Sequence, residues 1–546
     1  MSNSKKQNNF ILQAGILAAA GFISRIIGLL YVSPVQTIIG TTGFGYYSSA
    51  YNYYTIILLI SSYSIPSAIS KVIAQKLSVK EYRNAHRIFQ CALYYVLGVG
   101  LLASLFLYFG AGLFVEESAV PVLRVFAPTI FVYGILGVLR GYFQAHKSMV
   151  QTSVSQILEQ IVNAIVSIGA AYGFVKLAEK TINEGGNANA SAFGAMGSAV
   201  GTGAGVVAAL LFMAGIYTLN KGVIHKRIQR DRTLKVDSYA EISGMIAKVV
   251  LPFILSTAAY NLSASLNNKL YTSIMIYVKK AEEALVYNDY GIFSEATKVS
   301  NIPIAFASAM AAAIIPTVAQ LVTRQDLEGA KDKIYQAVKT IMIISIPCAA
   351  GLLALAKPVM QFLFPKEANL DLAGGSLMLL AVSVAFYALS TLSSSILQGI
   401  GKVNAPIINA VIALIIQTVV LVPMLLLADW GLYSLVIASI VYSLAMCILN
   451  QVSVRRALGY RQEIFSTFMM PTLAAVFMGA LAWAVYEGLY LLTEINVLSL
   501  FVAIAIAVVV YFVLLILFKG VNEDELRAMP KGYLLVRVAK KCRLMR

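Results

Sequence analysis

The sequence predicts an all-α fold, a polytopic membrane bundle of about fourteen transmembrane helices with both ends of the chain in the cytoplasm. Of its 546 residues, 59% are hydrophobic and only 12% are charged, and the mean hydropathy is +0.78. Soluble domains carry about 25% charged residues, so a water-soluble fold of this size could not cover so much apolar surface. The apolar residues form long runs, and short basic clusters separate those runs.

The apolar runs are long enough to be membrane spans, because a helix needs about 20 apolar residues to cross the hydrocarbon core. They lie near residues 9–33, 44–74, 88–113, 121–144, 152–176, 194–218, 243–277, 291–322, 336–357, 373–399, 404–427, 431–453, 467–490 and 495–518. The first run continues past Arg25 and many more follow it, so we expect a retained helix and not a signal peptide. The second, seventh and eighth runs exceed the length of a simple span, which predicts tilt, breaks or extension beyond the bilayer.

The distribution of charge predicts the orientation. With Lys5 and Lys6 inside, the tails and even-numbered loops carry roughly 28 of the 42 Lys and Arg residues, against roughly 6 in the other loops. The other loops instead carry acidic residues such as Glu116 and Glu117. Basic residues concentrate on the cytoplasmic side of membrane proteins. A multi-pass membrane protein with both termini in the cytoplasm is therefore expected, and the resemblance described below implies the plasma membrane of a bacterium.

Short matches recur at an offset of about 250 residues, six spans apart. The dipeptide Ile-Pro occurs at residues 65–66 and again at residues 315–316. A glutamine lies at the end of the fourth predicted span, Gln144, and another lies at the end of the tenth, Gln398. Six is an even number, so the copies share one orientation, which predicts two pseudo-symmetric six-helix lobes plus two extra helices. Chance similarity between apolar helices is the alternative. The expected parts are an N-lobe at 1–220, a basic cytoplasmic linker at 221–242, a C-lobe at 243–455, the two extra helices at 456–519 and a basic cytoplasmic tail at 520–546.

Three basic residues lie inside predicted spans, where charged side chains are costly and mark functional sites or ion pairs. Arg25, Lys269 and Lys298 each fall roughly 10–12 Å below the outer surface. Three cations at one level would repel one another unless water or an anion lies among them, so they predict a central cationic cavity that binds an anion. Polar neighbours of these residues extend the candidate substrate site: Ser24, Asn267 and Asn268. The alternative is that the cations reach for the outer headgroups or pair with a nearby acid.

Two carboxylates also lie inside predicted spans. Glu295 precedes Lys298 by one turn and could pair with it, and Glu159 lies at a depth similar to that of Arg140. Each is a candidate for a structural ion pair or for a coupling carboxylate, and both alternatives stay open at this point.

The sequence offers little for catalysis. The histidines His86, His146 and His225 fall in predicted cytoplasmic loops, the four cysteines show no metal-binding spacing, and no phosphate-binding loop is present. The glycines at 197, 201 and 205 form a small-residue stripe that predicts close helix packing. We therefore expect no enzyme activity, no cofactor, no metal and no nucleic-acid partner.

Four short segments, taken in order on this topology, carry a family resemblance. They are Ser24–Gly28 in the first run, Gly43–Tyr47 and Ser64–Lys71 in the second, and Gln156–Gln160 in the fifth. With them, the whole chain resembles the multidrug/oligosaccharidyl-lipid/polysaccharide flippase superfamily, in particular the MurJ-type lipid II flippases and their SpoVB-like sporulation relatives. Arg25 matches an arginine that the flippases need, and Lys298 falls where some members have another. Tyr31 replaces a second helix-one arginine, and a helix-two aspartate has no clear counterpart.

The resemblance implies two lobes around a central cavity, alternating access, and a groove for a polyprenyl tail at helices 13 and 14. It implies transport of lipid II, an anionic lipid-linked glycan for peptidoglycan and cell shape, with membrane lipids and the cell-wall synthesis machinery as partners. A flippase for another lipid-linked oligosaccharide or polysaccharide is the first alternative, and a drug/cation antiporter of the superfamily is the second. The membrane potential is the expected driving force, with any coupling cation unspecified.

Overall fold

The computed structural model describes residues 20–21, 23–63, 65–146, 148–231, 236–518 and 520–521, with isolated tail positions at 523, 533, 536–537 and 540. Within these ranges only the backbone is described at 63, 65, 67–68, 246–260, 309, 311–313 and 315–317. The described secondary structure is helical throughout and includes no strand. This confirms the all-α fold. The predicted tail at 520–546 lies largely outside the described residues.

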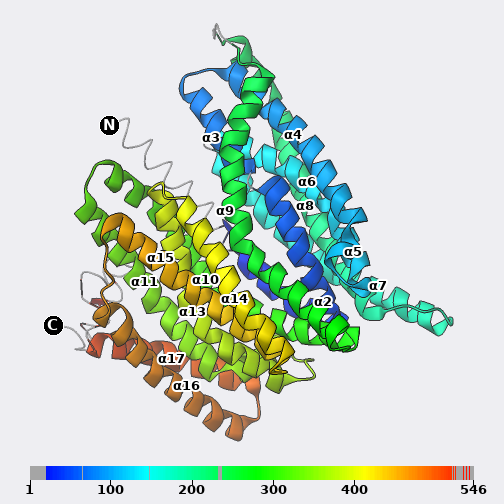
Figure 1. Ribbon diagram of the computed structural model, residues 1–546, viewed down its shortest axis with the longest axis vertical. Coiled ribbons are helices and arrows are strands. Elements are labelled where there is room, and N and C mark those ends of the chain that lie inside the picture. The colour runs from blue at the N-terminus through cyan, green and yellow to red at the C-terminus, as the bar shows by residue number, and fades with distance from the viewer. Residues whose placement is uncertain are drawn as a thin grey trace. The chain divides into compact units, whose positions relative to one another are not determined.

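The chain divides into two compact units, the first ending at Gly291 and the second beginning at Ile292. Figure 1 labels their helices. After a helix at Ile23–Leu30, unit 1 contains α2 (Val32–Leu58), the π-helix η1 (Leu59–Tyr63), α3 (Ile65–Ser78), α4 (Tyr82–Phe109), α5 (Ala111–Phe114), the 3₁₀ helix η2 (Glu117–Ala119), α6 (Val120–Ala145), α7 (Met149–Asn183), α8 (Ala190–Gln229), α9 (Tyr239–Ser273), the π-helix η3 (Ile274–Val278) and the start of α10 (Glu283–Thr323).

Unit 2 contains the rest of α10 and the helices that follow it. They are α11 (Leu327–Ala354), α12 (Ala356–Leu363), α13 (Leu370–Gly399), α14 (Asn404–Leu426), α15 (Leu432–Leu458), the π-helix η4 (Phe465–Met469), α16 (Met470–Thr493) and α17 (Asn496–Leu517). The last two pack against each other, and α16 also packs against α11. Their shared core includes Ala474, Met478, Ala503 and Tyr511.

The first two predicted spans are joined without a long loop. The helix at Ile23–Leu30 is bent by 44° from the helical segment Val32–Ser62. Inside α2 the only non-helical residue is Gly40, with φ 72° and ψ 170°. Glycine enters this region of positive φ without the steric penalty that a Cβ would bring. The chain thus changes direction at single residues, where the sequence predicted a loop at 34–43.

Two of the three overlong spans contain a π-helix, whereas the eighth, α10, is one continuous helix that extends beyond its predicted run. The second predicted run is interrupted by η1, and the seventh ends in η3. Single π-turns inside long helices widen the backbone locally and are common where a helix bends. The helix α8 runs on to Gln229, so the first part of the predicted linker at 221–242 is helical.

The glycine stripe at 197, 201 and 205 packs α8 against α7. A side-chain carbon at Gly201 would overlap the backbone of Ser167, and one at Gly197 would overlap that of Ala170. A carbon at Gly205 would overlap the carbonyl oxygen of Glu159. The prediction of close helix packing at this stripe is confirmed.

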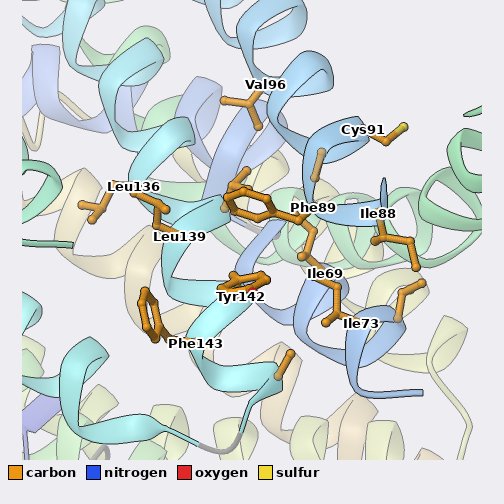
Figure 2. Close-up of a cluster of buried hydrophobic side chains, with 14 of the residues drawn as sticks. Ile69, Ile73, Ile88, Phe89, Cys91, Val96, Leu136, Leu139, Tyr142 and Phe143 are labelled. Atoms are coloured by element: carbon orange, nitrogen blue, oxygen red, sulfur yellow. The ribbon is translucent and has the colours of Figure 1, made fainter. Parts of the chain in front are cut away.

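The hydrophobic core of unit 1 joins α3, α4, α6 and α8. Figure 2 shows Tyr142 and Phe143 on α6 beside Phe89 on α4, with Ile69 and Ile73 on α3 close by. The Phe89 and Tyr142 ring centroids are 4.7 Å apart. Tilted aromatic pairs at this spacing add stabilisation beyond that from buried area.

The two units repeat one order of contacts. In unit 1, α6 packs against α4 and α8, and α7 packs against α8; in unit 2, α13 packs against α11 and α15, and α14 packs against α15. This is the pattern that a six-helix repeat predicts. The helix α9 packs against α2, α3 and α4 within unit 1. The lobe boundaries at 220 and 243 stay a prediction.

Ten of the helices in the described part of the chain are long and apolar enough to span a membrane, or eleven if the bent pair at Ile23–Ser62 counts as one span. A polytopic membrane bundle is thus confirmed, whereas the number fourteen is not. Parts of α9 and α10, the seventh and eighth expected spans, lie outside the residues whose side chains are described.

Candidate functional site

The candidate site begins on the short helix at Ile23–Leu30. Arg25 is exposed on this helix, although the run around it is apolar. The neighbouring Ser24 has a buried Oγ with no hydrogen-bond partner in the part of the chain that the structure describes. Buried hydroxyls are ordinarily satisfied, so Ser24 offers an unused polar group beside a cation.

Polar contacts attach this end of the chain to α7. The hydroxyl of Tyr31 accepts a hydrogen bond from Asn163 Nδ2 at 3.3 Å. A carbon added at Gly28 would lie 3.6 Å from Oε1 of Gln160. The tyrosine hydroxyl thus occupies a polar position without bringing a second permanent charge.

Arg140 and Glu159 form an ion pair between α6 and α7. The guanidinium Nη2 lies 2.8 Å from Glu159 Oε2, and Arg140 Nε donates to Ser155 Oγ at 2.9 Å. Arg140 is buried, 4% exposed. The ion pair that was one of the two alternatives for Glu159 is thus present in the structure, and a coupling role for Glu159 stays a prediction.

The predicted residues of α9 pack against α2. Asn268 is buried, and its Oδ1 accepts a hydrogen bond from Ser49 Oγ at 2.9 Å. Its Nδ2 is buried without a hydrogen-bond partner among the described residues. One turn earlier on α9, the carbonyl oxygen of Ser265 accepts a hydrogen bond from the Tyr53 hydroxyl at 3.1 Å. Asn267 is also buried.

Lys269 forms an ion pair with Glu116, a residue of a predicted outer loop. Its Nζ lies 3.3 Å from Oε1 of Glu116, which is 6% exposed. Tyr277 also donates to Glu116, and the Glu116 backbone N–H donates to Tyr287 at 3.3 Å. Glu116 therefore neutralises one of the three cations that predicted the cavity. The only sequence signal for it was an acidic pair between two spans.

Glu295 and Lys298 belong to the part of α10 that lies in unit 2. Glu295 is fully buried, Lys298 is partly buried, and the carboxylate acts electrostatically on the ammonium group. Arg25, Ser24, Asn267, Asn268 and Lys269 all lie in unit 1. A single cavity shared by all these residues, and their contact with substrate, stay predictions.

A resident metal would need clustered ligands. No group of three or more His, Cys, Asp or Glu residues that could hold a metal ion occurs in the described ranges. The polar groups brought together are instead hydroxyls, amides and ion pairs. Such groups can bind and orient a charged ligand, and no nucleophile–base pair is among those described above.

Comparisons with known proteins give a consistent result. A family model described as polysaccharide biosynthesis protein matches residues 12–322, and the MatE model matches residues 290–423. The chain is 26% identical to a lipid II flippase MurJ of Bacillus subtilis over 498 residues, which is 87% of each chain. It is 21% identical to stage V sporulation protein B of the same organism, over 97% of this chain and 100% of the relative.

Two solved structures share the fold. The lipid II flippase MurJ in an inward closed conformation has a TM-score of 0.61 at 14% identity, covering 91% of this chain and 97% of that one. An inward-facing multidrug resistance transporter of the MATE family has a TM-score of 0.57 at 17% identity, covering 80% and 98%. The second family match begins at residue 290, close to the start of unit 2.

Proposed function

The chain belongs to the polysaccharide biosynthesis protein family, within the multidrug/oligosaccharidyl-lipid/polysaccharide flippase superfamily, and we propose that it moves lipid II from the cytoplasmic to the outer leaflet of a bacterial plasma membrane. It acts by alternating access, without catalysis and without a cofactor. Both termini lie in the cytoplasm. The cell-wall synthesis machinery would use the delivered precursor.

The observation that carries this proposal is the exposed Arg25 on an otherwise apolar helix. An arginine inside a span is costly unless it pairs with polar groups of the protein or faces water or an anion, and the exposed side of Arg25 is open to such a ligand. Its planar guanidinium can bind a phosphate through two parallel hydrogen bonds. The pyrophosphate of a polyprenyl-linked glycan is such a ligand, and its lipid tail can stay in the bilayer.

The structure changes how the other two cations are understood. Lys269 forms an ion pair with Glu116, and Glu295, three residues before Lys298 on the same helix, interacts electrostatically with Lys298. In the proposed cycle each carboxylate balances its lysine charge when the anion is absent, and the substrate phosphates replace the carboxylates when the anion binds. Such an exchange avoids leaving a lysine charge buried without a counter-charge.

The driving force needs no nucleotide. In a cell that is negative inside, moving an anion outward gains about 2.3 kcal/mol per charge per 100 mV. A cation gradient could return the empty carrier to its starting state, with Glu159 or Glu295 as the coupling carboxylate. We therefore expect export to slow when the membrane potential is dissipated.

The experiment measures lipid II on the outer leaflet of cells depleted of their own flippase. Expression of this chain should restore exposure, and Arg25→Ala should reduce it by about tenfold or more, as expected for one lost charged contact to phosphate. Arg124→Ala is the matched control, because Arg124 is exposed and its Nε donates to Tyr108 O. Equal exposure with Arg25→Ala and wild type would refute the role of Arg25.

The second candidate is a flippase for another lipid-linked glycan. The match of residues 12–322 to the family model described as polysaccharide biosynthesis protein supports it. If the wild type fails to expose lipid II but is present at normal levels in the membrane, the substrate assignment is wrong and this candidate is favoured. A drug/cation antiporter would need carboxylates at its site. The exposed Arg25 therefore argues against a drug/cation antiporter.

A further inference from the structure

We infer that unit 1 carries a second binding site, a cavity that takes a small phosphate ester on the side of the basic loops. The cavity has a volume of about 250 Å³ and is lined by the ends of α3, α4, α6, α7 and α8. These ends adjoin the basic segments around Lys76, Arg87 and Lys226, which the charge pattern predicts to be cytoplasmic.

This cavity is separate from the proposed substrate site. No residue of the helix at Ile23–Leu30 or of α9 is among those that line it. Its volume lies below the roughly 300–1,000 Å³ of typical small-molecule sites. It is thus too small for the head of a lipid-linked saccharide. The inference does not rest on the proposed function, because none of the residues of the proposed substrate site lines this cavity.

The charge around the cavity is positive. Arg227, His86 and His146 line it, whereas its lining includes no aspartate or glutamate. The pKa of His146 lies below the ordinary 6.5, chiefly because of burial. A hydrogen bond with the Tyr142 carbonyl raises this pKa, and the nearby Arg227 cation lowers it further. Arg227 is therefore the permanent charge, and a guanidinium is suited to bind phosphate oxygens in pairs.

The histidines bring unused polar atoms. His146 Nδ1 lies 2.9 Å from the Tyr142 carbonyl oxygen and donates to it in the neutral ring, which leaves Nε2 for another partner. His86 Nδ1 is buried and has no hydrogen-bond partner among the described residues. Buried polar groups normally have a partner, so a ligand or the water it holds would satisfy His86.

Neutral polar side chains complete the lining. Ser148 Oγ donates to Oε1 of Gln151, so the amide Nε2 of Gln151 can donate to a ligand. Asn220 lines the same cavity. Amide and hydroxyl groups beside an arginine suit a phosphate that carries a small hydroxylated group, such as glycerol.

The wall of the cavity is already packed without a ligand. Tyr142 and Phe143, seen in Figure 2 within the core of unit 1, also line the cavity. The Tyr142 and His146 ring centroids are 4.5 Å apart. A preformed wall lowers the entropy cost of binding.

A phosphate ester can reach this place from two sources. One is the headgroup of an anionic inner-leaflet phospholipid, since basic pockets between transmembrane helices on the cytoplasmic side bind such headgroups. The other is a soluble phosphate ester of the cytoplasm. The chemistry at the cavity is shared, and the two arms of the test distinguish the sources.

The test uses the full chain in detergent. One arm titrates glycerol 3-phosphate by calorimetry, and the other counts phosphatidylglycerol retained on the protein by native mass spectrometry, with phosphatidylcholine as reference lipid. Arg227→Gln should weaken binding by about tenfold or more. Lys226→Gln is the matched control, because Lys226 is the neighbouring cation on α8 and does not line the cavity.

A second variant fills the cavity without removing a charge. Val223 lines the cavity and is 54% exposed, so Val223→Trp should block the site and still fold. Binding of either probe that both Arg227→Gln and Val223→Trp weaken, but Lys226→Gln does not, supports the inference and identifies the source. Binding of neither probe by the wild type, or equal binding by Arg227→Gln and Lys226→Gln, overturns it.

Discussion

The hairpin α7–α8 in unit 1 and the hairpin α14–α15 in unit 2 occupy corresponding places in the repeat, yet they are held together differently. The glycine stripe of α8 lets its backbone approach α7 closely, and the Arg140–Glu159 ion pair joins α7 to α6. The helices α14 and α15 contain no glycine. They are joined by Asn409, whose Nδ2 donates to Asn450 Oδ1 at 2.9 Å.

The neutral network of unit 2 is spread over more partners than the ion pair of unit 1. Asn450 is fully buried, and its Nδ2 also donates to Ser394 Oγ at 2.8 Å and to Ser390 Oγ at 3.3 Å. Without water in the hydrocarbon core, every polar group must find a partner in the protein. An ion pair meets this need with two groups whose loss is costly, whereas an amide network meets it with several weaker bonds.

The largest effect is expected from splitting the ion pair. Arg140→Ala leaves Glu159 charged and partly buried, so we expect a loss of about 3–5 kcal/mol in the free energy of unfolding. The measurement is unfolding by sodium dodecyl sulfate in mixed micelles.

The paired variant Arg140→Leu with Glu159→Leu is the control. Removing both charges should restore stability to within about 1 kcal/mol of the wild type. If the double variant is as unstable as Arg140→Ala, packing and not charge accounts for the loss, and the contrast between the two hairpins fails.

The next effect tests the glycine stripe. Gly201→Leu puts a side chain into the backbone of Ser167, so the hairpin must open, at a cost of about 1–3 kcal/mol or more. Gly215→Leu is the matched control on the same helix, because nothing lies within 4 Å of a carbon added there. Equal stability of the two variants would contradict close packing at the stripe.

A carboxylate of unit 2 lies at the start of a helix and not between helices. Burial alone would raise the pKa of Glu463, but hydrogen bonds from the backbone and hydroxyl groups of Ser466 and Thr467 lower it to about 2. Its folded pKa is below the ordinary value of 4.5, so its stabilisation is present above about pH 4.5 and is lost as the pH falls toward 2.

Glu463→Ala should therefore cost about 1 kcal/mol near neutral pH, as for other helix-capping groups. The difference from the wild type should shrink as the pH is lowered below 4.5. Unfolding curves at several pH values measure it. A difference that stays constant down to pH 2 would show that the charge of Glu463 contributes nothing.

The smallest effect is expected in the amide network. Asn450→Ala should cost about 0.6 kcal/mol and at most about 1.7, the range measured for hydrogen bonds between membrane helices. The same micelle titration measures it. A loss as large as that of Arg140→Ala would mean that the amide network stabilises its hairpin as strongly as the ion pair stabilises the other. The contrast between the two hairpins would then be wrong.

Individual residues show how far sequence reasoning reached the site. The Arg140–Glu159 pair could be predicted, because opposite charges at equal depth in adjacent apolar runs have few other partners. The Lys269–Glu116 pair could not, since 153 residues separate the two and Glu116 lies outside the predicted spans. Asn409 and Asn450 gave no signal, because a neutral amide hardly changes the hydropathy of its run.

The sequence by itself determined that this protein is a helical membrane bundle and which loops carry the basic charge, because hydropathy and charge act through composition over long windows. It also determined the glycine stripe, since spacing along a helix is a local property. Only the tertiary structure decided the partner of each buried polar group, the turn at Gly40 and the cavity beside Arg227. Those features depend on contacts between residues far apart in the chain, which local patterns do not specify.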